Sequence, residues 1–190
     1  FLNLVIKIRI GYIFKKLKNT QEKILKNGTN AKYIIADLKK KEDINYLCQI
    51  ALEENIKILV NNAGIICPNL PFKDITDDII DDMISVNLVA PIKIINALSC
   101  SLDHIVNINS MVGLEAKRNR TLYAPGKWGL KGFSDSLKQE EIEYNILDVY
   151  PTNIKTWPER ENAMEIDYVL KEIYEAMLEC KDDLILDGRK

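Results

Sequence analysis

Histidine is nearly missing from this chain of 190 residues, since His104 is the only one. Cysteine is also sparse, and no two of the four cysteines, Cys48, Cys67, Cys100 and Cys180, stand in C-x-x-C spacing. Structural zinc sites need clusters of these two residue types, and disulfide frameworks need regularly spaced cysteines. The sequence therefore predicts no metal centre and no disulfide framework, and it favours a reducing, cytoplasmic setting.

The sequence also lacks an excess of charge and a long apolar run. The formal net charge is -2, which gives no basic footprint for a nucleic acid. No apolar run is long enough to span a membrane, and no signal peptide is visible. Hydrophobic residues make up 47% of the chain and charged residues 28%, so residues 1–190 are expected to form a single globular domain.

Short apolar runs alternate with segments of helical spacing along the whole chain. The apolar runs predict strands at 4–8, 33–36, 56–60, 105–108, 145–150 and 184–186. The segments between them predict helices at 13–26, 41–54, 76–98, 123–143 and 166–178, the first of them capped by Gly28. Most of the strands are near-continuous apolar runs, as in a parallel sheet that is covered by helices on both faces. The sequence thus predicts a doubly wound α/β domain with a parallel sheet.

Three side chains between 105 and 127 could form one acid–base site. Tyr123 and Lys127 are four residues apart on a predicted helix and so share a face. A free tyrosine has a pKa of about 10, and a nearby ammonium lowers it. Ser110 follows a strand, at the end where ligands bind in open α/β sheets. Taken alone, Y-x-x-x-K is explained better by a half-buried tyrosine beside a surface lysine, which is much the commoner arrangement.

A proline interrupts the helix predicted at 76–98. Pro91 has no N–H, so the carbonyl four residues earlier, at Asn87, loses its helical partner. A carbonyl freed in this way can bind a water molecule, or the helix can simply kink there. The residues themselves leave both explanations open.

Five motifs follow one another along the chain: Asn61-Asn62-Ala63-Gly64, Val86-Asn87-Leu88, Ser110, Tyr123-x-x-x-Lys127 and Pro151-x-x-Ile154-x-Thr156. In this order and spacing the chain resembles the short-chain dehydrogenase/reductase family over nearly its whole length. The resemblance implies a Rossmann-like fold. It also implies hydride transfer between a nicotinamide cofactor and a small carbonyl or alcohol substrate.

The resemblance gives each acid–base residue a role. Tyr123 is implied to be the acid–base residue, and Ser110 to orient the substrate carbonyl. Lys127 is implied to hold the nicotinamide ribose and to lower the pKa of Tyr123. Asn87 is implied to hold a water of a proton relay through its main-chain carbonyl, which agrees with the effect of Pro91.

The resemblance also implies a set of cofactor-binding residues. Asp37 would accept a hydrogen bond from the adenine amino group, although an aspartate after a strand also caps turns. Asn61 would line the adenosine pocket, and the backbone of Ile154 would contact the nicotinamide amide. Tyr123 and Lys127 would complete the set at the nicotinamide end.

Arg9 bears on the choice between the two nicotinamide cofactors. Ile8 stands where family members that prefer NAD carry an acidic residue, and Arg9 follows it. An arginine there suits the 2′-phosphate of NADP, whereas a solvated charge at a strand end is the alternative explanation. The sequence favours NADP, with NAD possible.

The chain departs from the family pattern at its beginning. The family's first strand and its glycine-rich turn are absent, and Gly11 alone does not supply the turn. Without that central strand, the strand pair at 4–8 and 33–36 has no partner that links it to the strand at 56–60. The polypeptide is therefore expected to continue upstream of Phe1. Smaller departures are Pro125 and Gly126 inside Y-x-x-x-K and Thr152 after Pro151.

Two other functions compete with the oxidoreductase. A non-catalytic dinucleotide-binding or scaffold protein of the same fold is suggested by the lost glycine turn and opposed by the intact Ser110, Tyr123 and Lys127. An epimerase or dehydratase is the third alternative, for which the short C-terminal region leaves little room. By analogy with the family, a homodimer or homotetramer is expected to form through the helices that carry Asn87 and Tyr123.

Overall fold

The computed structural model describes residues 2–8, 13–26, 28–66, 70–156 and 159–189. Every predicted strand and helix is present in it. The strands are β1 (Leu2–Ile8), β2 (Asn30–Ala36), β3 (Ile58–Asn61), β4 (His104–Ile108), β5 (Asn145–Pro151) and β6 (Asp183–Leu186). The helices are α1 (Ile13–Lys26), α2 (Lys41–Glu53), α3 (Asp77–Ile84), α4 (Ala90–Leu98), α5 (Tyr123–Leu137) and α6 (Ile166–Leu178). Single turns of helix lie at Phe72–Asp74, Ser85–Val89 and Met111–Gly113.

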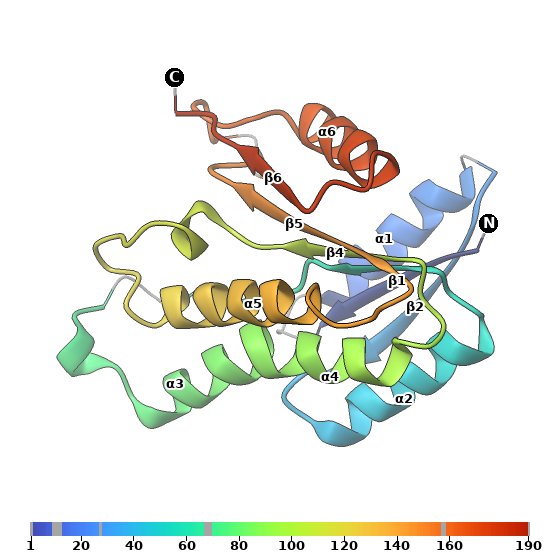
Figure 1. The fold of residues 1–190 in the computed structure, drawn as a ribbon, viewed down its shortest axis with the longest axis horizontal. Coiled ribbons are helices and arrows are strands. Elements are labelled where there is room, and N and C mark those ends of the chain that lie inside the picture. The colour runs from blue at the N-terminus through green and yellow to red at the C-terminus, as the bar shows by residue number, and fades with distance from the viewer. Residues whose placement is uncertain (1, 9–12, 27, 67–69, 157–158, 190) are drawn as a thin grey trace.

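All described strand pairs are parallel, but they form two sheets. One sheet pairs β1 with β2, and the other has the order β3-β4-β5-β6. No described strand lies between β1 and β3, so the break expected from the absent central strand is confirmed. Figure 1 shows α6 on one face of the four-stranded sheet and α4 and α5 on the other.

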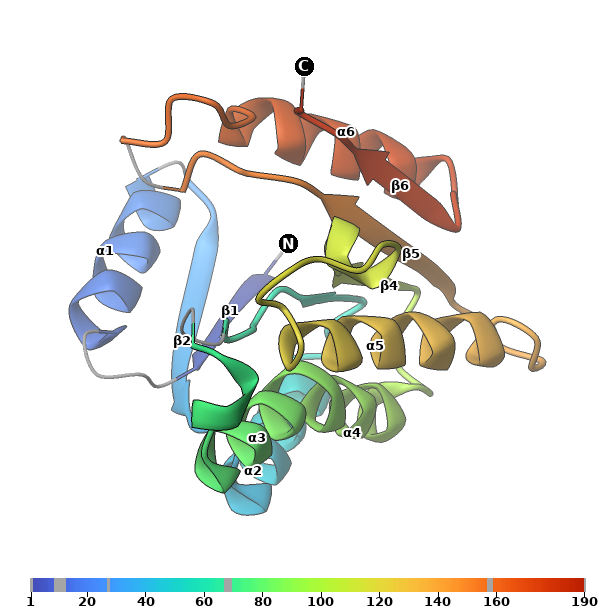
Figure 2. The same cartoon turned by 90° about the vertical axis from the view of Figure 1, so that its left-hand side faces the viewer.

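The main hydrophobic core fills the space between the larger sheet and helices α2 and α4. Leu47 and Ile95 meet there with Leu59 and Ile105 from the strands, and all four are buried. A smaller core lies beneath α6, around Val149. The two helices of the main core pack against one another, so α2 ties the β1–β2 pair to the rest of the molecule (Figure 2).

One helix ends where the sequence predicts, and another ends earlier. Gly28 has a φ of 76°, and the N–H groups of Gly28 and Thr29 cap the carbonyls of Leu25 and Ile24, so the predicted cap is confirmed. The helix predicted at 123–143 ends instead at Leu137. The acidic residues that follow are unfavourable at the negative end of a helix dipole, which accounts for the early ending.

The helix predicted at 76–98 is not continuous. It is divided into α3 and α4 by a wide π-helical turn over Ser85–Val89, in which Ala90 donates to the carbonyl of Ser85. Pro91 stands in the first turn of α4, where its missing N–H costs least. The widened turn is how this helix accommodates the proline. None of the described helices combines the length and the apolar character needed to cross a membrane.

Candidate active site

The carboxyl end of β4 and the start of α5 bring three predicted residues together. Ser110 follows β4, where its hydroxyl accepts a hydrogen bond from the N–H of Val112 at 3.2 Å. Tyr123 and Lys127 share one face of the first turns of α5, and the Lys127 Nζ lies 5.7 Å from the centre of the Tyr123 ring. The expected neighbourhood of a hydroxyl, a phenol and an ammonium is therefore present.

Lys127 is held deep in this site. Its side chain is only 5% exposed, and its Nζ donates to the carbonyl of Ile108 at 2.7 Å. Burial lowers the pKa of Lys127 to about 8. A lysine ammonium has three N–H donors, so Lys127 can bind the strand carbonyl and still donate hydrogen bonds to a ligand beside it.

The pKa of Tyr123 moves against the sequence-based expectation in this arrangement. Burial raises it above the ordinary value, while hydrogen bonding with Ser110 and the charge of Arg120 act in the lowering direction. The ammonium of Lys127 turns instead to the carbonyl of Ile108. The phenol is consequently protonated at neutral pH.

Asn87 organises the loop that follows β3. Its side chain is 2% exposed and makes two hydrogen bonds of 2.8 Å, accepting from the N–H of Ile65 and donating to the carbonyl of the same residue. A Cβ on Gly64 would lie 3.2 Å from the Asn87 Oδ1, and one on Gly126 would lie 3.0 Å from its Cβ. Both glycines are needed for this close approach, which explains why Gly126 stands inside Y-x-x-x-K. The role of the Asn87 carbonyl in binding water stays a prediction.

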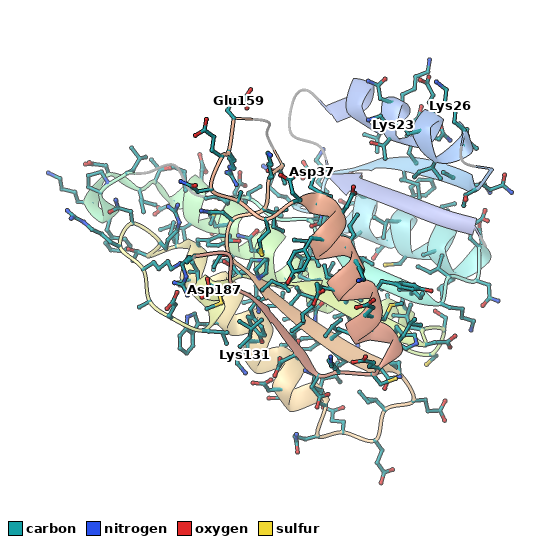
Figure 3. The ribbon with its side chains drawn as sticks, turned by 90° about the horizontal axis from the view of Figure 1, so that it is seen from above. Lys23, Lys26, Asp37, Lys131, Glu159 and Asp187 are labelled. Atoms are coloured by element: carbon teal, nitrogen blue, oxygen red, sulfur yellow. The ribbon has the colours of Figure 1, made fainter. Side chains whose placement is uncertain are left out.

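Besides Tyr123 and Lys127, three predicted cofactor-binding residues lie in the described part of the chain. Asp37, labelled in Figure 3, accepts from the N–H of Lys39 at 3.1 Å and so caps its own turn. Asn61 ends β3, beside the acid–base residues in the sheet order. Ile154 forms a single β-bridge with Met164. Arg9 lies outside the described residues, so its predicted contact with a 2′-phosphate stays a prediction, as do the cofactor roles of the other three.

Buried polar residues around this site include three that the sequence motifs did not indicate. Asn109 is 3% exposed and donates to the main-chain carbonyl of Lys127 at 3.1 Å, so it ties the end of β4 to α5. Asn107 and Asp148 are fully buried on β4 and β5. The signal was available, since polar residues recur inside the otherwise apolar strands IVNIN and NILDVY.

A separate hollow of about 540 Å³ lies at the far ends of α4 and α5. Its apolar floor includes Ile95 and Phe133, and its rim includes Glu140 and Glu143. It shares no residue with the acid–base group. Among the described residues, no group of three histidine, cysteine, aspartate or glutamate side chains is arranged to hold a metal ion.

Some curated proteins with similar sequences are named as oxidoreductases or reductases, and others have names that state no enzyme activity. The chain is 35% identical over 126 residues to nodulation protein G of Rhizobium sp. (strain N33), which covers 63% of this chain and 51% of that protein. It is 30% identical over 128 residues to a 3-oxoacyl-[acyl-carrier-protein] reductase of Chlamydia muridarum, covering 64% and 51%. An uncharacterised oxidoreductase of Listeria monocytogenes is 28% identical over 153 residues, covering 75% and 61%. The matches thus span between half and two thirds of these relatives.

Solved structures share the fold at lower identity. A blue fluorescent protein from a metagenomic library, solved with NADPH, has a TM-score of 0.84 at 21% identity, over 96% of this chain and 85% of that one. A short chain dehydrogenase from Burkholderia cenocepacia, solved with NADP, has a TM-score of 0.80 at 20% identity, over 97% and 85%. The sequence model of the short chain dehydrogenases matches residues 6–165. With this match and the motifs around Tyr123, the chain belongs to the short-chain dehydrogenase family.

Proposed function

We propose that this protein is an oxidoreductase that transfers a hydride between a nicotinamide cofactor, NADP in preference to NAD, and a small carbonyl or alcohol. The observation that carries the proposal is the grouping of Ser110, Tyr123 and the buried Lys127 at the carboxyl end of β4. The relatives named as reductases and the structures solved with NADPH or NADP support the same chemistry.

The proton chemistry falls to the side chains of this chain. Ser110 donates a hydrogen bond to the substrate oxygen and orients it toward Tyr123. In the reducing direction, Tyr123 gives its phenolic proton to that oxygen as the carbon gains a hydride, so that a carbonyl becomes an alcohol. The raised pKa of Tyr123 keeps the phenol in the protonated form that this direction requires. Lys127, close to the ring, stabilises the phenolate that remains.

The described residues fit the two nucleoside ends of the proposed cofactor. Its nicotinamide supplies or accepts the hydride. The buried ammonium of Lys127 suits ribose hydroxyls, and the backbone at Ile154 suits the nicotinamide amide. Asn61 and Asp37 suit the adenosine end, because each side chain carries an oxygen that can accept a hydrogen bond. The glycine-rich turn that would hold the pyrophosphate is lacking in the sequence, and Arg9 remains the basis for preferring NADP.

Oxidation of NADPH by the full-length protein, measured against a panel of ketones and aldehydes beside Tyr123→Phe, tests the proposal. The wild-type protein is expected to turn over at least one carbonyl compound, with turnover lost in the variant. Repeating the assay with NADH tests the cofactor preference, which the variant Arg9→Ala is expected to weaken. An Arg9→Ala protein with unchanged preference would refute the role of that residue.

The second candidate is a non-catalytic dinucleotide-binding or scaffold protein of the same fold. Tight NADPH binding by the full-length protein, without turnover on any compound of the panel, would decide for it. An epimerase or dehydratase would consume no net NADPH yet convert its substrate. A homodimer or homotetramer remains a proposal by analogy with the family, and a cytoplasmic setting remains a proposal from the sparse, unpaired cysteines.

A further inference from the structure

A line of buried polar side chains crosses the larger sheet from the surface to Asn61. It begins at Lys138, just after α5, whose Nζ lies 3.1 Å from the Asp148 Oδ2. The other carboxylate oxygen accepts from the Asn107 Nδ2 at 3.2 Å, and that nitrogen also donates to the Ser134 Oγ at 3.0 Å. The Asn107 Oδ1 accepts from the Asn61 Nδ2 at 2.8 Å.

The strand register explains why these groups meet. Asn61 is the partner of Asn107 in the pairing of β3 with β4, and Asn107 is the partner of Asp148 in the pairing of β4 with β5. Partners in adjacent parallel strands point to the same face of a sheet, so the three side chains form one row. Asn107, Ser134 and Asp148 are each 0% exposed. Water therefore cannot replace any of these hydrogen bonds without opening the core.

The hydrogen bonds along this row can run in only one direction. Burial raises the pKa of Asp148, whereas Lys138 and the hydrogen bonds from Asn107 and Ser134 act in the lowering direction and favour its ionised form. Lys138 is a donor only, and both oxygens of an ionised Asp148 are acceptors only. Asn107 must therefore turn its Nδ2 toward Asp148, which leaves its Oδ1 facing Asn61. Asn61 in turn must offer its own Nδ2. Its Oδ1 is left over, and within the described part of the chain it has no hydrogen-bond partner.

We propose that Lys138 and Asp148 are positioning residues that act through Asn107 to make Asn61 present an oxygen, and not an NH₂ group, to the bound nucleotide. The ligand atom that this oxygen selects is a donor, such as a ribose hydroxyl or an adenine amino group. This inference rests on the proposed function, because it places Asn61 beside the cofactor. It adds a rule for which end of the Asn61 amide faces the cofactor, and it traces that rule to Lys138 at the other end of the row.

The variant Asp148→Asn reverses this direction without changing the size of the side chain. The oxygen of the new amide must accept from Lys138, and its Nδ2 must donate to Asn107. Asn107 then flips, and Asn61 presents NH₂ to the ligand. We expect the Kd for NADPH to rise about tenfold, the effect of losing one hydrogen bond to the ligand.

A double variant separates polarity from packing. In Asp148→Asn with Lys138→Met, no cation claims the amide oxygen of residue 148. That oxygen can face Asn107 again, with the NH₂ group toward the place that Lys138 leaves beside the carbonyl of Asp182, which Lys138 contacts at 2.9 Å. We expect the Kd for NADPH to return to within about twofold of wild type. Lys131→Met, which removes a surface lysine of α5, is the matched control and should leave the Kd unchanged.

Hydrogen exchange of the Asn61 side-chain NH₂, followed by NMR in the cofactor-free protein, gives a second readout. Protection in wild type and in the double variant, with fast exchange in Asp148→Asn, supports the inference. Equal exchange and equal Kd values in all three proteins overturn it, as does a double variant that binds as weakly as the single one. A wild-type protein that binds no nicotinamide nucleotide refutes the proposed function instead, and the exchange pattern still decides the direction of the hydrogen bonds.

Discussion

Gly126 offers a sharp test of how α5 is docked in the active site. A Cβ at this position would lie 3.0 Å from the Asn87 Cβ, an atom fixed to the backbone of the π-helical turn. Asn87 cannot withdraw easily, because its side chain is tied to Ile65 by two hydrogen bonds of 2.8 Å. Gly126→Ala should therefore force α5 away from Asn87. A Cβ on Gly132, in the same helix, would meet nothing within 4 Å.

The two glycines should respond to alanine with opposite signs. Gly132→Ala gains the helix propensity of alanine, about 0.5–1 kcal/mol. Gly126→Ala gains the same term but incurs overpacking of about 1–3 kcal/mol at a buried site. We expect Gly126→Ala to be less stable than Gly132→Ala by about 2 kcal/mol, or roughly 4–8 °C in Tm for a chain of this size.

Thermal and urea unfolding of both variants, together with NADPH oxidation, measure these effects. Gly132→Ala should keep wild-type turnover, whereas Gly126→Ala should lose turnover even at temperatures where it is fully folded, because Tyr123 and Lys127 shift with the helix. A Gly126→Ala protein as stable and as active as Gly132→Ala would show that the approach of α5 to Asn87 does not matter.

Three further predictions concern the same site. Tyr123→Phe should still bind NADPH but lose turnover, as measured by titration and by NADPH oxidation; retained turnover would refute its role as proton donor. Lys127 has a folded pKa of about 8, below its unfolded value, so the unfolded chain binds more protons between pH 8 and 10.5. The free energy of unfolding should therefore rise with pH across this window, by up to about 3 kcal/mol. Urea unfolding should show that this rise vanishes in Lys127→Met. Equal pH profiles of the wild-type protein and the variant would contradict the burial of the lysine charge. Asn87→Ala leaves the N–H and carbonyl of Ile65 without partners and should lose about 1–3 kcal/mol of stability, while Asn96→Ala on the exposed face of α4 should be neutral.

The alternation of strands and helices could be predicted from the sequence because it follows from local hydrophobic patterns. The mostly apolar run at 105–108 became β4, and the positive φ of Gly28 follows from its place after a helix. The separation of the two sheets could also be anticipated, since strand order leaves β1 and β3 without a common neighbour. These features depend on a few residues at a time.

Features that depend on long-range contacts could not be predicted in the same way. The π-helical turn at Asn87 results from Pro91 together with the close approach of Gly126 from another helix. Burial raises the pKa of Tyr123, where the sequence predicted a lowered value, and burial depends on contacts between distant segments. The ammonium of Lys127 likewise donates to a strand carbonyl nineteen residues away in the chain. The row from Asn61 to Lys138 needs the register of three strands, which no local pattern contains.

The central claim is that Tyr123 completes a hydride transfer between NADPH and a carbonyl compound. The most direct measurement offers the full-length protein NADPH carrying deuterium at the transferable position, with the carbonyl panel, and follows deuterium into the alcohol by mass spectrometry. We expect deuterated alcohol from the wild-type protein and none from Tyr123→Phe. Equal deuterium transfer by both proteins, or tight NADPH binding with no deuterated product from any compound, would contradict it.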